Sequence, residues 1–250
     1  MVDDGDARKA RDRLAVGLDV PDLTRARALL AQLGDAAGWL KVGLELYTAA
    51  GPEAIRVAAE RARVFLDVKL HDIPHTVAGA AAAATRHGVS LLTVHASGGA
   101  DMLRAAREGA EEAAAKLGRP RPRMVAVTVL TSLAEKDLAS VGVRGTLDDQ
   151  VARLVDLARS SGIDGVVASP LEAAAIRARC GPDFFVVTPG IRPAGASRDD
   201  QSRVATPAEA IAAGADLLVV VRPVLRAPDP AAAVRGIVAE IERGLGSRAA

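Results

Sequence analysis

The sequence lacks the features of a secreted or membrane-spanning protein. It contains one cysteine, Cys180, so no disulfide can form within the chain. Residues 1–13 are charged throughout and have no apolar stretch of the kind a signal peptide needs. The Ala-rich stretch from Val77 to Thr85 is shorter than the roughly 18 to 20 residues that a membrane helix requires, and Arg86 follows it. We therefore expect a cytoplasmic protein that does not span a membrane.

The sequence also lacks an excess of charge and has few aromatic residues. Its 32 Lys and Arg residues nearly balance its 31 Asp and Glu residues, so no overall field attracts nucleic acid. Any anionic ligand must then be bound by a local site. Aromatic residues make up only 2% of the chain, and the core must therefore be built from Ala, Val, Leu and Ile, which favours helices packed on strands.

Short apolar runs alternate one for one with helical patterns along the whole chain. The expected strands are Leu14 to Val20, Trp39 to Leu46, Val64 to His71, Leu91 to Ser97, Met124 to Ser132, Gly165 to Ser169, Phe184 to Pro189 and Leu217 to Arg222. The expected helices are Leu23 to Leu33, Pro52 to Ala62, Val77 to His87, Asp101 to Leu117, Leu147 to Ser160, Leu171 to Ala178, Pro207 to Ala213 and Pro230 to Arg243. Eight such repeats predict an α/β fold, a single (β/α)8 TIM barrel over residues 1–250. Residues 1–13 are expected to form a mobile N-terminal extension.

The residues at the expected element boundaries support this division. Helix N-caps are predicted at Asp22, Asp101, Thr206 and Asp229, and glycines such as Gly118 and Gly244 follow helical runs where C-caps belong. The one long irregular stretch, Gly190 to Ala205, follows the seventh strand and is too polar to lie in the core. Loops at that edge of a barrel are usually functional.

Charged residues interrupt the first three expected strands. Strands of a parallel barrel are covered on both faces, so a charge within one needs an explanation. The alternation of side chains directs leucines toward the helices and four polar residues into the interior, and Asp19 ends the first strand in the same way. The four are Lys41, Asp67, Lys69 and His71. Because buried ion pairs seldom stabilise more than apolar replacements, this convergence favours chemistry over a structural role.

Asp67, Lys69 and Asp72 form the pattern D-x-K-x-x-D. An ammonium held between carboxylates stays protonated, so Lys69 is predicted to act as a fixed cation and proton donor toward a developing carbanion. Asp72 has two interpretations of equal weight. It belongs either to this cluster or to the start of the next helix, as an N-cap with Pro74 in the first turn.

The segment FLDVKLHDIPHT, residues 65–76, resembles the signature of the orotidine 5'-phosphate decarboxylase family. The resemblance extends along nearly the whole chain through VGLDV, KVGLELYTAAGPE, VHASGG, AVTVLTS, VTPGIRP, DDQSR and the Arg-Pro pair at 222–223. The resemblance implies a cofactor-free and metal-free enzyme that converts orotidine 5'-phosphate to UMP and CO2. It also implies a homodimer with shared active sites. The balanced charge and the short apolar runs, in turn, predict no nucleic-acid or membrane partner.

The same resemblance assigns roles to residues at matching positions. Lys69 would protonate C6 of the pyrimidine and Asp67 would lie beside the substrate carboxylate. Asp72 and Thr76 would reach into the partner's site. Asp19 and Lys41 would hold the ribose hydroxyls. The remaining substrate-binding positions are Thr131 near the base, Gln201 between base and phosphate, and Arg192, Val221 and Arg222 at the phosphate.

Two positions depart from the family pattern. Val221 stands where glycine usually precedes the last-strand arginine, and it is predicted to crowd the phosphate or to strain a glycine-only backbone angle. His75 stands where asparagine is expected and keeps hydrogen-bonding capacity. Two alternative functions stay open: a magnesium-dependent sugar-phosphate enzyme built on the same acidic motif, and a nucleotide-binding protein impaired by Val221. The four histidines lack metal-ligand spacing, so no metal site is assigned.

Overall fold

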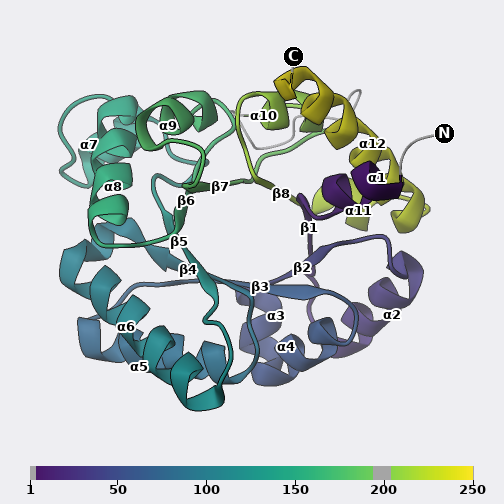
Figure 1. The fold of residues 1–250 in the computed structure, drawn as a ribbon, viewed down its shortest axis with the longest axis horizontal. Coiled ribbons are helices and arrows are strands. Elements are labelled where there is room, and N and C mark those ends of the chain that lie inside the picture. The colour runs from purple at the N-terminus through teal and green to yellow at the C-terminus, as the bar shows by residue number, and fades with distance from the viewer. Residues whose placement is uncertain (1–3, 194–203, 250) are drawn as a thin grey trace.

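The computed structural model describes residues 4–193 and 204–249, and within them eight parallel strands close into a barrel in chain order (Figure 1). The strands are β1 Leu14–Gly17, β2 Trp39–Gly43, β3 Arg63–Leu70, β4 Leu91–His95, β5 Arg123–Val127, β6 Gly165–Val167, β7 Phe185–Thr188 and β8 Leu217–Val220. The predicted (β/α)8 barrel is thereby confirmed. The strands are mostly shorter than expected, because several of the apolar runs continue into turns past the last ladder residue.

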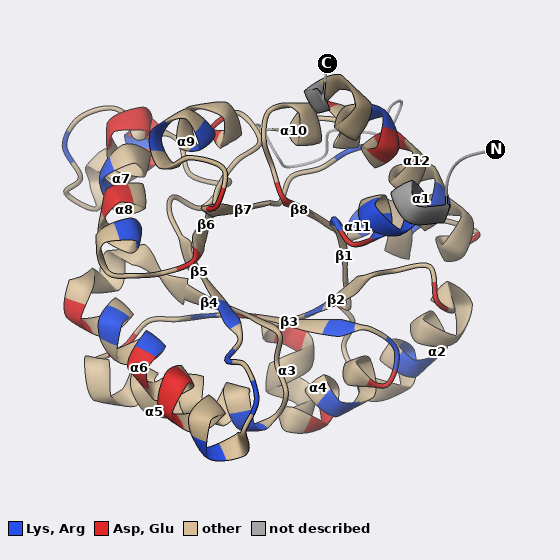
Figure 2. Ribbon diagram, viewed as in Figure 1, with Lys and Arg blue, Asp and Glu red and all other residues tan. Residues whose placement is uncertain are grey.

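Helices surround the barrel (Figure 1), and many of the charged residues belong to these helices (Figure 2). They are α1 Asp4–Arg11, α2 Leu23–Leu33, α3 Leu44–Ala50, α4 Pro52–Ala59, α5 Pro74–Arg86, α6 Gly99–Leu117, α7 Glu135–Ser140, α8 Leu147–Ser160, α9 Ala173–Cys180, α10 Pro207–Ala212, α11 Arg222–Leu225 and α12 Pro230–Ala249, with a 3-10 turn η1 at Ala96–Gly98. Among these described helices, none is long and apolar enough to cross a membrane.

Several predicted boundaries are wrong, each for a local reason. The run expected to extend the second strand to Leu46 instead turns into helix α3 after Gly43, so Leu44 is 54% exposed and does not face the core. Helix α6 begins at Gly99, which places Asp101 in its first turn and not at its N-cap. Gly244 lies inside α12, where a Cβ atom would stand 2.6 Å from the Ala208 carbonyl oxygen of α10. Its role is close helix packing, not a C-cap.

The N-terminal residues also differ from expectation. Asp4–Arg11, part of the predicted mobile extension, forms helix α1, whose Ala10 is fully buried. The other predicted N-caps agree with the structure, because the side chains of Asp22 and Thr206 accept hydrogen bonds from the backbone three residues on, and that of Asp229 does the same.

Side chains alternate between two cores. One face of each strand packs under the helices, as Leu40 and Leu66 do, and the opposite face fills the barrel interior. The interior layer consists of Ala15, Trp39, Phe65, Leu91, Val125, Val187, Leu217 and Val219. Lys41 and Asp67 lie two residues after Trp39 and Phe65 in their strands, so their side chains point to the same inward face. The apolar interior layer therefore lies directly below the charged residues along the barrel axis.

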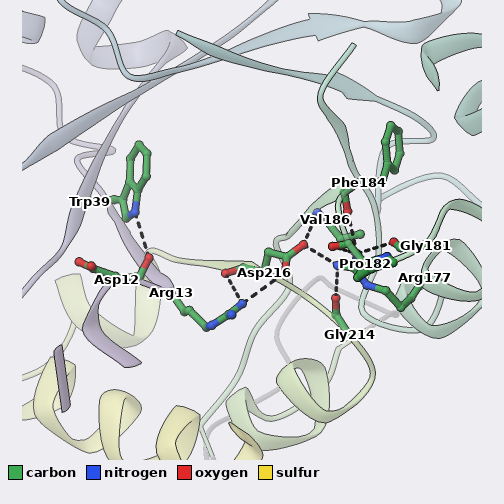
Figure 3. A network of polar contacts seen from close by, with 10 residues as sticks. All are labelled: Asp12, Arg13, Trp39, Arg177, Gly181, Pro182, Phe184, Val186, Gly214 and Asp216. Atoms are coloured by element: carbon green, nitrogen blue, oxygen red, sulfur yellow. Dashed lines mark hydrogen bonds and ion pairs between the residues drawn. The ribbon is translucent and has the colours of Figure 1, made fainter. Parts of the chain in front are cut away.

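Polar contacts close the end of the barrel where the strands begin. The Arg63 guanidinium lies 4.2 Å from the Trp39 ring centre, and the Trp39 indole donates to the Asp12 carbonyl. Figure 3 shows the Trp39 contact together with a second group of contacts, in which Arg177 of α9 pairs with Asp216, the residue before β8. With this end closed, the opposite end, where the strands finish, is the place for a site.

Candidate active site

Four charged side chains alternate in sign across the ends of the first three strands. The Lys41 ammonium lies 2.7 Å from Asp19 Oδ1 and 3.8 Å from Asp67 Oδ2. The Lys69 ammonium lies 2.9 Å from the other Asp67 oxygen, Oδ1. We call Asp19, Lys41, Asp67 and Lys69 the charge row. The predicted convergence of these four residues is confirmed. His71, which was predicted to point into the interior with them, is exposed, because β3 ends at Leu70.

Burial strengthens the electrostatic interactions within the charge row. The Lys41 side chain is 7% exposed and that of Asp67 is 16% exposed, so both charges have lost most of their water and depend on each other. Lys69 is 31% exposed and stands at the open end of the row. A cation with one carboxylate partner and one accessible side is placed to interact with a ligand that enters from the barrel mouth.

The backbone at Lys69 is unusual. Its φ is +50°, and among the described residues it is the one non-glycine residue with positive φ. Pairing between β3 and β4 is shifted at the same place: Leu66 pairs with Leu92, whereas Leu70 pairs with Val94. Between these two pairs β3 advances four residues and β4 advances two, so β3 contains a bulge, and Asp67 and Lys69 lie within it. Such strain is typical of functional sites.

Two hollows meet at Asp67 and Lys69. One, of about 240 Å³, is mainly apolar and is lined by Phe65, Asp67, Lys69, Val127, Val129, Leu130, Thr131, Ser132, Val167, Ala168, Pro189 and Val219. The other, of about 360 Å³, is lined by five charged residues, and we call it the charged hollow; they are Asp19, Lys41, Glu45, Asp67 and Lys69. Gly190 and Val221 also line it. Thr131, predicted to lie near the base, is among the residues that line the apolar hollow.

Asp72 and Thr76 lie at the rim of the barrel mouth. Asp72 is exposed, and its carboxylate accepts a hydrogen bond from the Ile73 amide at 2.6 Å. The N-cap of α5 is Ile73, so the interpretation of Asp72 as an N-cap is wrong, whereas Pro74 does occupy the first turn. Thr76 is exposed in that turn. Both side chains are accessible to another molecule placed over the mouth.

Two of the predicted phosphate residues follow the last two strands, Arg192 after β7 and Arg222 after β8. Arg192 is 7% exposed, and its amide donates to the Ala205 carbonyl at 3.0 Å, which brings the two ends of this loop together. Arg222 is half-buried at the first position of α11. Gln201 lies outside the described residues.

Val221 does not adopt a backbone conformation that requires glycine, because its φ is −124°. That part of the prediction is wrong. Its side chain packs over Gly17 of β1, where a Cβ atom would stand 2.5 Å from Val221 Cγ2 and 3.1 Å from Lys41 Cε. Val221 therefore narrows the charged hollow through its side chain and requires glycine at position 17.

Strand β4 contributes Thr93, which no sequence pattern singled out, and His95, one of the four histidines that were assigned no metal. Thr93 is fully buried and hydrogen-bonded to the backbone of Lys69 and to Asp67. His95 stacks on His71 with ring centres 5.2 Å apart, and its Nδ1 lies 2.7 Å from the Ser97 hydroxyl. Burial, with smaller effects of His71 and Lys69, lowers the pKa of His95. A threonine inside an apolar strand carries no sequence signal that distinguishes it from an ordinary core residue.

Within residues 4–193 and 204–249, no three or more His, Cys, Asp or Glu side chains gather in an arrangement that fits a metal ion. The two carboxylates of the charge row are each engaged by a lysine ammonium.

Comparisons with known proteins agree with this geometry. Residues 12–237 match the family described as "Orotidine 5'-phosphate decarboxylase / HUMPS family". The chain is 57% identical to the orotidine 5'-phosphate decarboxylase of Moorella thermoacetica, over 93% of each chain, and 53% identical to that of Thermobifida fusca, over 92% of this chain and 96% of the relative. A crystal structure of the Lactobacillus acidophilus enzyme superimposes with a TM-score of 0.82 at 37% identity, covering 91% of this chain and 98% of that one. The chain therefore belongs to the orotidine 5'-phosphate decarboxylase / HUMPS family.

Proposed function

We propose that this protein decarboxylates orotidine 5'-phosphate to UMP and CO2 in pyrimidine nucleotide synthesis, without a metal or cofactor. The observation that carries the proposal is the charge row, which ends in the partly exposed ammonium of Lys69 where two hollows meet. The names of relatives that are up to 57% identical support the same reaction. The single cysteine is consistent with a reducing compartment, and we place the reaction in the cytoplasm.

The two hollows suggest how the substrate is oriented. The apolar hollow, with Phe65 and Val127 in its lining and Thr131 at its side, suits a pyrimidine ring. The second hollow presents Asp19 and Lys41, which suit the ribose hydroxyls. The phosphate would then reach the loop after β7 and the start of α11, where Arg192, Arg222 and Gln201 would bind it. Phosphate sites formed by the last loops are common in this architecture.

The chemistry assigned to Lys69 follows from charge development. When the bond between C6 and the carboxylate breaks, its electron pair stays on C6 and CO2 leaves. The ammonium of Lys69 stabilises this carbanion more than it stabilises the substrate, which is the condition for acceleration. Its proton then passes to C6, and the neutral amine regains a proton from solvent. Asp67 would lie near the departing carboxylate while it holds Lys69 Nζ at 2.9 Å.

The test is turnover measured in excess chelator. Ultraviolet absorbance follows the loss of orotidine 5'-phosphate, and chromatography identifies UMP. Lys69→Ala is expected to lower kcat by at least about 10³-fold while the variant still binds UMP. Lys116→Ala, which removes an exposed lysine of α6, serves as the control and should leave kcat unchanged. Wild-type protein that binds UMP without turnover would overturn the proposal, and so would turnover that stops with chelator.

We also propose a homodimer whose protomers share active sites. Most large apolar side chains that are exposed in the described residues follow the ends of strands, among them Leu44 and Ile73, at 54% and 65% exposure. Ile73 follows Asp72 in the chain, and Leu44 lines the charged hollow together with Asp67 and Lys69. A second copy placed there would cover the apolar residues and bring its Asp72 toward the charge row.

Mixed dimers test the sharing of sites. Lys69→Ala and Asp72→Ala proteins are each expected to be inactive. If Asp72 acts across the interface, co-refolded mixtures contain hybrid dimers with one intact site, and about a quarter of wild-type activity should return. No recovery in a mixture whose hybrid dimers are demonstrated by mass spectrometry would show that Asp72 acts within its own chain or not at all.

A further inference from the structure

Thr93 occupies a central position beneath the charge row. It lies in the middle of β4, is fully buried, and uses its hydroxyl twice. The hydroxyl oxygen accepts a hydrogen bond from the Lys69 amide at 2.8 Å, and the hydroxyl proton is donated to Asp67 Oδ1 at 3.2 Å. Asp67 Oδ1 also accepts from Lys69 Nζ at 2.9 Å. One hydroxyl thus connects the backbone of Lys69 to the carboxylate that holds its ammonium.

The place of this hydroxyl in the sheet explains why it matters. Between the Leu66–Leu92 and Leu70–Val94 pairs, β3 carries two more residues than β4, so regular ladder hydrogen bonds are interrupted there. The Lys69 amide, inside the interrupted stretch, is bonded by a side chain instead. Lys69 also has a φ of +50°, a conformation that a lysine keeps only when its surroundings hold it. Thr93 supplies a contact of this kind.

We propose that Thr93 is a positioning residue for the reaction. Its hydroxyl holds the bulged backbone at Lys69 and the carboxylate of Asp67 in one geometry, and so aims the ammonium at the reacting carbon. The inference rests on the proposed function and extends it to a residue that touches no substrate. Misplacement of a catalytic group by about 1 Å lowers rates by as much as about 100-fold.

The test compares three substitutions at buried threonines. Thr93→Val removes the hydroxyl and keeps the shape, whereas Thr93→Ser keeps the hydroxyl and loses a methyl group. Thr85→Val is the matched control, because Thr85 is 1% exposed and its hydroxyl bonds the Ala81 carbonyl within α5, away from the site. For each protein kcat and KM are measured, together with the dissociation constant for UMP and the thermal unfolding midpoint.

We expect Thr93→Val to lower kcat by about 10- to 100-fold with a KM and a UMP affinity within a few-fold of wild type. Thr93→Ser should recover most of kcat, and Thr85→Val should keep it. The inference is overturned if folded Thr93→Val retains wild-type kcat, if Thr93→Ser loses as much kcat as Thr93→Val, or if Thr85→Val loses the same amount. Absence of turnover in wild-type protein would overturn the proposed function and this inference with it, whereas wild-type turnover with an unaffected Thr93→Val refutes the inference alone.

Discussion

The Arg177 network at the closed end of the barrel allows a stability prediction that is independent of the chemistry. The Arg177 guanidinium donates to the carbonyl oxygens of Gly181, Pro182, Phe184 and Gly214 at 2.8 to 2.9 Å and pairs with Asp216 (Figure 3). The Arg177 and Asp216 side chains are 16% and 14% exposed. We consider the substitution Arg177→Met, which keeps much of the apolar stem and removes every one of these hydrogen bonds.

The loss of stability depends on the charge that the substitution leaves buried. Asp216 keeps hydrogen bonds from the Val186 amide and from Arg13, but it loses its most buried cationic partner. Removing one member of a buried pair costs about 3 to 5 kcal/mol, because the other charge stays desolvated. For a domain of this size, each kcal/mol lowers Tm by about 2 to 4 °C. We therefore expect Tm to fall by about 6 to 20 °C.

The assay is thermal unfolding followed by circular dichroism, with kcat measured well below the transition. Arg179→Met is the matched control, since Arg179 lies on the same helix and pairs with Asp156 with both side chains about half exposed. Its Tm should stay near that of wild type, because exposed ion pairs contribute little. Both variants should keep kcat. Equal Tm values for the two variants would refute the idea that burial makes the Arg177–Asp216 pair stabilising. A loss of kcat in Arg177→Met alone would show that the Arg177 network also affects the active site at the other end of the barrel.

Three further predictions concern the barrel mouth. Val221→Gly removes the side chain that narrows the charged hollow, so it is expected to tighten substrate binding; an unchanged or weaker affinity in titrations would contradict this. Gly17→Ala places a methyl group 2.5 Å from Val221 Cγ2 and should lower the free energy of unfolding by about 1 to 3 kcal/mol. In the double variant, Val221→Gly should recover most of this stability. Additive effects of the two changes in urea unfolding would show that the side chains do not compete. Burial lowers the pKa of His95 from its ordinary value of 6.5, so below that pH the unfolded chain binds more protons at this residue than the folded chain. The free energy of unfolding should therefore fall as pH drops through 6.5, and it should fall less in His95→Asn. If the urea midpoints of the two proteins depend on pH in the same way, His95 is not the cause.

Local patterns in the sequence were sufficient for the architecture. Strand and helix periodicities depend on which side chains meet within a few residues, and eight alternations of the two leave few folds other than a closed barrel. The same alternation placed Lys41 and Asp67 on the inward face together with Trp39 and Phe65. It did not predict where each run stops being a strand, since an apolar run such as Trp39 to Leu46 continues from β2 into a helix without a change in composition.

What only the tertiary structure decided are contacts between residues far apart in the chain. The sequence alone identified Lys69 as a candidate catalytic cation, but it predicted two carboxylates around it, whereas Asp67 pairs with Lys69 and Asp72 is exposed and bonds the Ile73 amide. The positive φ of Lys69 and its link to Thr93 depend on a register shift between β3 and β4. The packing of Val221 on Gly17 likewise depends on β8 closing against β1. Such contacts arise from cross-strand register and barrel closure, which side-chain periodicity along one strand does not encode.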